Sequence, residues 1–136
     1  MSLMRRMKRC IEVLVAVIAT ISAMWMLVAA DEEKSATFTK GKFAVPISHE
    51  DVKAVWTARG YSEPKIQYYA KGWARGEHTH PVSLIMTIVT GRMEFVFGGQ
   101  HFVVEPGDEL FYPADMVHSA RNLYDGTTQM MESYTR

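Results

Sequence analysis

The hydrophobic positions of the chain change their spacing near its middle, from the spacing of a helix to that of strands. In the first part, Val52, Val55 and Trp56 recur at the three- and four-residue steps of one helix face. Ser48 precedes them as a candidate N-cap with an acidic residue three positions on, and Gly60 follows as a stop. We therefore predict one short helix that covers an end or flank of the main domain.

From Lys65 onward, apolar and polar residues alternate with a period of two, as in strands whose two faces differ. Gly98-Gly99 and Pro106-Gly107-Asp108 interrupt the alternation with turn-forming residues, and a last strand is expected over Thr127–Tyr134. Short strands separated by such turns predict an all-β sandwich or barrel. The positions expected on the apolar side are Ile66, Tyr68, Ala70, Met86, Ile88, Met93, Phe95, Phe97, Phe102 and Val104.

Residues 1–30 have the order of a targeting segment. Four basic residues end at Arg9, an apolar stretch runs from Ile11 to Leu27, and Val28-Ala29-Ala30 places small residues ahead of Asp31. This order is typical of a signal peptide, and cleavage is the interpretation that we favour. An uncleaved anchor is the alternative, because the stretch approaches the roughly 20 residues that span a bilayer. In both cases we expect the rest of the chain to be exported, as a periplasmic or secreted protein.

The charge of the chain changes when this segment is set aside. The whole chain has a formal net charge of zero, whereas residues 31–136 carry 11 basic and 14 acidic residues, a net charge of −3. Nothing there indicates a nucleic-acid surface. The only cysteine, Cys10, lies in the leader, which excludes an internal disulfide or a cysteine-based zinc motif from the remainder. Residues 31–46 are expected to form a linker or irregular arm ahead of the main domain, residues 47–136.

Candidate chemistry lies in a closely spaced pair of histidines. Residues two apart in a strand point to the same face, so His78 and His80 would face the same side. A third imidazole from another strand, that of His118, would complete three sides of a metal site. Taken alone, the pair also fits chance occurrence, because isolated histidines are usually surface residues or satisfied core residues.

Two patterns around these histidines resemble the two motifs of the cupin family. In the first, Gly72 precedes the histidine pair and Gly91 closes the pattern. The residues of the second are Gly107, Pro113, Asp115, His118 and Asn122. Asp115 occupies a place where glycine is usual. The resemblance covers about residues 65–130. Within the family, the chain is similar to small single-domain cupins that carry a short helix ahead of the barrel. It implies one all-β domain, a cupin double-stranded β-helix (jelly-roll barrel) over about residues 65–135.

The resemblance also implies a metal site, and this chain departs from the family pattern there because it lacks the carboxylate. One divalent transition metal, Fe, Mn, Ni, Cu or Zn, would be held by His78, His80 and His118. The family's first motif includes a glutamate, but its place counted back from Gly91 is occupied by Leu84. Some cupin oxygenases use such a three-histidine set. Neutral imidazoles leave the charge of the ion uncompensated, so an anionic or enolate ligand is expected in its open positions.

We also predict where other residues lie around this site. Glu77 and Asn122 are candidates for an outer shell around the metal, with a role in holding local backbone as the alternative for Asn122. Glu94 is expected to pair with Arg92 or solvent, and His101 to face water. The expected cavity wall consists of Leu84, Met86, Phe95, Phe102 and Met116. Simple filling of the barrel core is the alternative for most of this wall.

Three functions fit these expectations. The first is an exported metal-binding cupin that binds a small molecule. The second is a metal-dependent enzyme, similar to a non-haem dioxygenase, acting on a small anionic or enolisable substrate. The third is a metal-free interaction module. One cupin fold carries many functions, so the fold alone does not choose among them. Small cupins often pair, which implies a homodimer, and membrane contact is expected only through an uncleaved leader.

Overall fold

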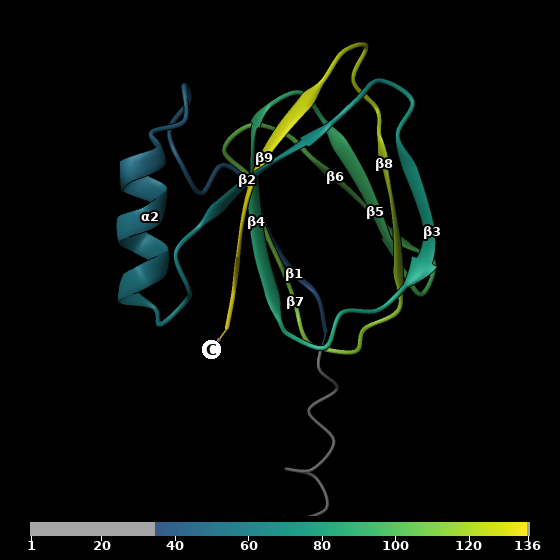
Figure 1. Cartoon of the computed structure of the whole chain (residues 1–136), viewed down its shortest axis with the longest axis horizontal. Coiled ribbons are helices and arrows are strands. Elements are labelled where there is room, and N and C mark those ends of the chain that lie inside the picture. Colours follow the sequence, from purple (N-terminus) through teal and green to yellow (C-terminus); the bar gives the residue numbers. More distant parts are fainter. Residues whose placement is uncertain (1–34, 136) are drawn as a thin grey trace, which may run out of the picture. The chain divides into compact units, whose positions relative to one another are not determined.

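A computed structural model describes residues 35–135, which form two antiparallel sheets and one helix (Figure 1). The expected signal peptide or anchor, residues 1–30, lies outside the described residues. Within the described part, no helix is both long enough and apolar enough to span a membrane. The helix lies beside the larger sheet, and the smaller sheet lies on the opposite side of that sheet.

The chain crosses repeatedly between the two sheets. The larger sheet has the order β1–β7–β4–β9–β2, and the smaller has the order β3–β8–β5–β6. The strands of the larger sheet are β1 (Thr37–Thr39), β2 (Lys65–Tyr69), β4 (Leu84–Thr90), β7 (Glu109–Tyr112) and β9 (Thr128–Tyr134). Those of the smaller sheet are β3 (Ala74–His78), β5 (Met93–Phe97), β6 (Gln100–Val104) and β8 (His118–Asn122). Two facing sheets with such crossings are typical of a jelly roll, so the predicted fold class is confirmed.

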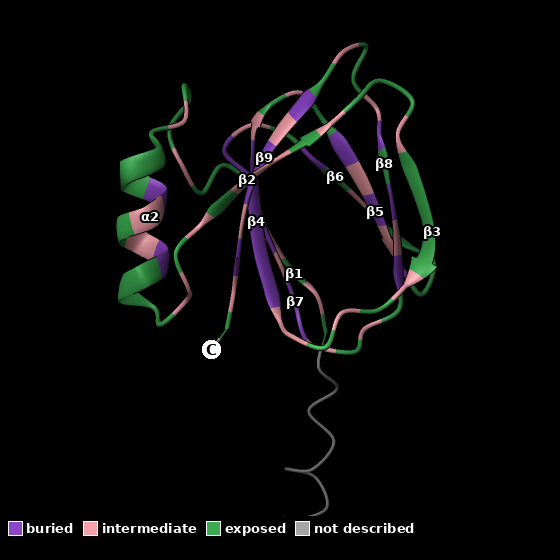
Figure 2. Cartoon of the chain, in the orientation of Figure 1, coloured by how far each residue is buried: buried purple, intermediate pink, exposed green. Residues whose placement is uncertain are grey.

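The main apolar core lies between the sheets. Leu84, Met86 and Ile88 of β4 pack there, while Ile85 between them packs with the helix instead. Consequently β4 is buried along most of its length, as Figure 2 shows. The smaller sheet contributes Met93, Phe95, Phe97, Val104 and Ala120. Burying one large apolar side chain contributes about 1.5–3 kcal/mol, so the alternation seen in the sequence supplies much of the force that closes the two sheets.

Helix α2 (His49–Ala58) forms where its capping residues predict. The Ser48 hydroxyl accepts a hydrogen bond from the backbone N–H of Asp51 at 3.2 Å. Trp56 is fully buried beneath the helix, and its indole N–H donates to the Glu109 carboxylate at 2.8 Å. The helix thus covers the outer face of the larger sheet, and the prediction of a short flanking helix is confirmed.

The first strand of the larger sheet was not expected. The arm predicted over residues 31–46 contains β1, which pairs antiparallel with β7, with Thr37 opposite Phe111. A strand of three residues is too short for its side chains to show a period of two, which is why the sequence pattern did not reveal it. The arm is therefore part of the sheet rather than an irregular linker alone.

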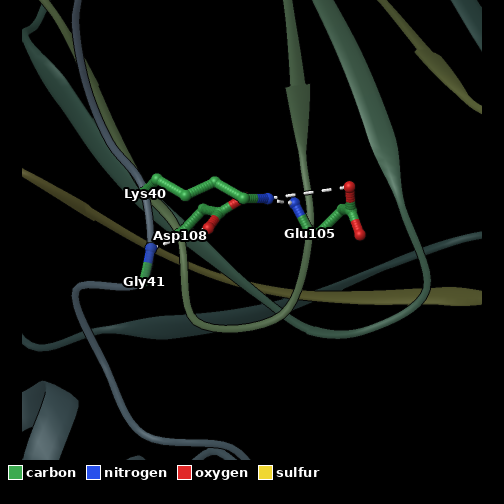
Figure 3. Close-up of polar contacts among 4 residues, drawn as sticks. All are labelled: Lys40, Gly41, Glu105 and Asp108. Carbon is green, nitrogen blue, oxygen red and sulfur yellow. Dashed lines mark hydrogen bonds and ion pairs between the residues drawn. The ribbon is translucent and has the colours of Figure 1, made fainter.

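A buried carboxylate fastens the arm beyond β1. Asp108 accepts hydrogen bonds from the Gly41 N–H at 2.9 Å, the Lys40 ammonium at 3.2 Å and the Glu105 N–H at 3.0 Å (Figure 3). The backbone approaches closely here, since a Cβ at Gly107 would lie 2.6 Å from the Phe43 carbonyl oxygen. The turn predicted at residues 106–108 is present, and it holds the arm as well as reversing the chain.

Candidate metal centre

Three histidines meet at one end of the two sheets. His78 ends β3 and pairs across the ladder with His118, which begins β8. The ring centroids are 4.3 Å apart for His78 and His118, 4.9 Å for His78 and His80, and 5.2 Å for His80 and His118. One ring nitrogen from each histidine lies within 4.8 Å of the others. The structure therefore brings together all three residues proposed from the sequence.

Regular strand alternation does not produce this meeting. The β3–β8 register shifts between Arg75 and His78, and His80 lies two residues beyond the end of β3. The His80 carbonyl accepts a hydrogen bond from the Asp115 N–H at 2.8 Å, which ties this loop to the one before β8. A bulge and a fixed loop therefore aim the pair, where the sequence suggested a straight strand.

Backbone carbonyls orient two of the imidazoles. Nδ1 of His78 lies 2.8 Å from the Gly76 carbonyl oxygen, and Nδ1 of His118 lies 2.9 Å from that of Met116. Because a carbonyl only accepts, each Nδ1 must carry the proton, which leaves Nε2 with a free lone pair. Metal-binding histidines commonly have this backbone support. A set of three imidazoles suits Zn, Cu, Fe or Ni, so the residues present fit a transition metal.

Burial keeps two of the rings in the form that binds metal. Desolvation lowers the pKa of His118 to about 4, although its hydrogen bond to the Met116 carbonyl works in the opposite direction. Desolvation also lowers the pKa of His80, and the neighbouring His78 adds to the effect. His118 stacks on Phe97 at 5.2 Å between centroids. At neutral pH these two imidazoles are therefore neutral and ready to donate a lone pair.

A cavity of about 240 Å³ opens beside the histidines. Met86 and Phe95 line it, as expected. Leu84 instead lies in the closed core at 2% exposure, and Phe102 and Met116 pack against that core rather than line the cavity. These three residues therefore contribute to the barrel core, which was the alternative given for most of the expected wall. Leu84 lies between Tyr112 and Tyr134 in the sheet, and the larger Tyr112 side chain lines the cavity.

The cavity also has a polar lining that the sequence analysis missed. Its polar members beyond the histidines are Gln67, Tyr69, Arg75, Tyr112 and Glu132. On β2 the expected face was wrong, because Ile66 packs with the helix cluster and Tyr68 is 67% exposed. The opposite side of β2 therefore faces the cavity. On β9, Glu132 shares its alternation with buried Met130, a signal that would have placed this glutamate on the inner face.

Among the described residues, no hydrogen bond joins either expected outer-shell residue to the three histidines. Glu77 is exposed. The Asn122 Nδ2 atom lies 2.8–3.0 Å from the Tyr69, Ala70 and Gly126 carbonyl oxygens, which share its two N–H donors, and Oδ1 accepts from the Tyr124 N–H and the Thr128 hydroxyl. Asn122 thus holds backbone segments together, which was its alternative role.

Two further polar expectations concern the outer face of the smaller sheet. Glu94 was expected to pair with Arg92 or solvent, but it pairs with Arg121. The Glu94 Oε1 atom lies 2.9 Å from the Arg121 Nε atom. His101 is exposed, as expected, and lies 3.6 Å from the same carboxylate. These residues belong to a surface network away from the cavity lining. Their charges therefore provide no ligand for the histidine cluster.

Comparisons with known proteins bear on the family. A family model described as a cupin domain matches residues 65–134. A search of curated proteins finds no match. Among solved structures, a DMSP lyase from Ruegeria pomeroyi DSS-3 is 27% identical over 54% of this chain and 37% of that chain, with a TM-score of 0.48. The present chain therefore spans less than half the length of that lyase.

Two shorter structures are covered more fully. A cupin superfamily protein from Desulfitobacterium hafniense DCB-2 is 17% identical over 76% of this chain and 80% of that chain, with a TM-score of 0.48. A predicted oxalate decarboxylase from Thermotoga maritima is 19% identical over 65% of this chain and 74% of that chain, with a TM-score of 0.49.

Proposed function

Since this chain belongs to the cupin domain family, we propose that it binds one divalent transition metal through His78, His80 and His118 and holds a small anionic ligand against that ion. The observation that carries the proposal is the convergence of three ring nitrogens within 4.8 Å. The cavity beside them has room for one small molecule. A bound ion would supply a Lewis acid that polarises a ligand oxygen.

The preference for an anion follows from the charges of the site. Three neutral imidazoles do not offset the charge of a divalent ion, and the histidine cluster, as found among the described residues, includes no carboxylate. Arg75 adds a positive charge to the cavity lining, which also contains the Glu132 carboxylate. Desolvation raises the pKa of Tyr69 to about 12 and also raises that of Tyr112, so both phenols stay protonated and are able to donate hydrogen bonds to ligand oxygens.

A metal-dependent enzyme similar to a non-haem dioxygenase is the second candidate. The observation that favours it is the position of protonated Tyr69 and Tyr112 in the same cavity as the histidines, where they would orient an enolate or carboxylate. Oxygen consumption by the iron-loaded chain with small enolisable dicarbonyls or thiols, lost in His80→Ala, would support this candidate. Absence of turnover across such a panel would leave the binding function.

Metal analysis of the purified full-length chain tests the main proposal. We expect about one Mn, Fe, Ni, Cu or Zn ion per chain. His80→Ala should weaken binding by more than the 10–100-fold that is typical of changes to outer-shell partners. His101→Ala is the matched control, because this exposed histidine lies outside the cluster. A chain that stays empty and equally heat-stable after addition of these ions would contradict the proposal.

We also propose that residues 31–136 act after export, in the periplasm or outside the cell, and that the domain pairs as a homodimer. The support for export is the order of basic, apolar and small residues in positions 1–30. Fractionation of cells that express a C-terminally tagged chain tests export and distinguishes a cleaved leader from an anchor by size. Light scattering of the purified protein tests the dimer, and a cytoplasmic or monomeric protein would contradict the respective proposal.

A further inference from the structure

The cavity beside the histidines contains one carboxylate among its lining residues, that of Glu132 on β9. Its Oε1 atom accepts hydrogen bonds from the Gln67 amide and the Tyr134 hydroxyl, both at 3.0 Å. No hydrogen bond from the described residues reaches the other oxygen, Oε2. The side chain is therefore held in place through one oxygen while the second remains open to a ligand.

The position of Glu132 separates it from the metal ligands. The cluster of groups able to hold an ion contains the three histidines and does not include this glutamate. The carboxylate nevertheless belongs to the same cavity, and two donors fix its orientation before any ligand arrives. A preorganised polar group in a small cavity is a usual means by which a site orients and selects its ligand.

We propose that Glu132 makes the site selective for small anions that also carry a hydrogen-bond donor, a hydroxyl or an ammonium group, at the end remote from the metal. This inference rests on the proposed function, because the ion would hold the anionic end. An ionised carboxylate only accepts hydrogen bonds, so Oε2 requires a donor. A ligand ending in a methyl group would desolvate Oε2 without replacing its hydrogen bonds to water, which is unfavourable.

Gln67 and Tyr134 strengthen the inference, because the Tyr134 hydroxyl and one N–H of the Gln67 amide both donate to Oε1 rather than to Oε2. A ligand that ended in a second carboxylate would meet the negative charge of Glu132 instead of a donor. Hydrogen bonds to a charged group contribute about 1.5–3 kcal/mol, or roughly 10–150-fold in affinity. We therefore expect at least about a tenfold preference for ligands with a terminal donor.

The test compares matched acids on the zinc-loaded full-length chain by titration calorimetry. The probes are butyrate, 4-hydroxybutyrate and 4-aminobutyrate, with the corresponding series one carbon shorter and one carbon longer. The wild-type chain should bind a donor-terminated acid about tenfold or more tightly than the apolar acid of the same length. Glu132→Gln, which keeps the shape and removes the charge, should reduce this preference to less than about threefold with unchanged zinc content.

Glu94→Gln is the matched control, because that carboxylate pairs with Arg121 on the outer surface and does not line the cavity. It should leave the preference unchanged. A second comparison uses only the wild-type chain and therefore does not depend on the folding of a variant. 4-Methoxybutyrate keeps the terminal oxygen but lacks the donor, so it should bind as weakly as the apolar acid.

Three results would overturn the inference. The first is that the wild-type chain shows no donor preference at any chain length of the acids. The second is that the donor preference persists in Glu132→Gln. The third is that this variant loses zinc, which would make Glu132 a metal ligand. If the wild-type chain takes up no metal, the proposed function fails together with this inference. Normal zinc binding without donor selectivity contradicts the inference alone.

Discussion

His118 shows how one buried side chain links the fold to the site. The residue is 2% exposed, with its ring 5.2 Å from that of Phe97 and 4.6 Å from that of Tyr112. Its Nδ1–H donates to the Met116 carbonyl, so only Nε2 remains for a metal. The packing that fixes the ring also disfavours its protonated form, and the same residue therefore combines a candidate metal ligand with a pH-dependent contribution to stability.

Replacing His118 by phenylalanine should reveal that contribution. Burial lowers the folded-state pKa to about 4 from an ordinary value of 6.5, so the folded chain binds fewer protons than the unfolded chain between these values. The associated stability is fully present above pH 6.5 and is lost as the pH falls toward 4. Urea unfolding of the metal-free chain should therefore show a larger loss from about pH 7 to about pH 4 in the wild type than in His118→Phe. Equal losses would contradict this prediction.

The histidine cluster was accessible to sequence reasoning, whereas the rest of the polar cavity lining was not. Histidine spacing and flanking glycines singled out His78, His80 and His118, and even Asp115, found in place of a glycine, has a positive φ of 62°. Gln67 and Glu132 escaped because polar residues in strands usually face solvent. The inner position of Glu132 becomes evident only when the alternation of Met130 on β9 is extended to it.

At the scale of elements, strong local signals were reliable and tertiary choices were not. Ser48 and the apolar stripe of the helix predicted α2 because capping and helical spacing are local properties. The inward face of β2 was assigned wrongly because both sides of the larger sheet are covered near the helix. Ile66 therefore has an apolar partner on the outer side, and hydrophobicity alone does not identify the face that lines the cavity.

The β3–β8 pair shows a second limit at this scale. A regular strand would place His78 and His80 on one side by alternation. The two histidines do lie close together, but the strand is irregular at this point. The bulge after Arg75 and the hydrogen bond from Asp115 to the His80 carbonyl position the two rings. Side-chain period predicted that the histidines would meet, but register shifts and loop contacts are set by long-range packing, which one sequence does not display.

For the domain as a whole, one buried carboxylate ties the arm before α2 to the larger sheet, in addition to the pairing of β1 with β7. Asp108 is 2% exposed and accepts two backbone N–H groups together with the Lys40 ammonium. The Phe43 N–H adds a hydrogen bond to the Gly107 carbonyl at 2.9 Å. Segments more than 60 residues apart are therefore held by Asp108, whereas the Lys40 side chain is 66% exposed and contributes little by itself.

Asp108→Ala should release the arm without dissolving the barrel. The change leaves the Gly41 and Glu105 N–H groups without their acceptor, at a cost of about 1–3 kcal/mol for each one that stays buried. Hydrogen exchange should accelerate across residues 37–43, while β9, an inner strand of the sheet, remains protected. Lys40→Ala is the control and should change the free energy of unfolding by less than about 1 kcal/mol, because it removes the contact of a largely exposed ammonium group and leaves both backbone hydrogen bonds intact. If hydrogen exchange across residues 37–43 accelerated equally in both variants, the Lys40 contact, and not the backbone contacts of Asp108, would hold the arm.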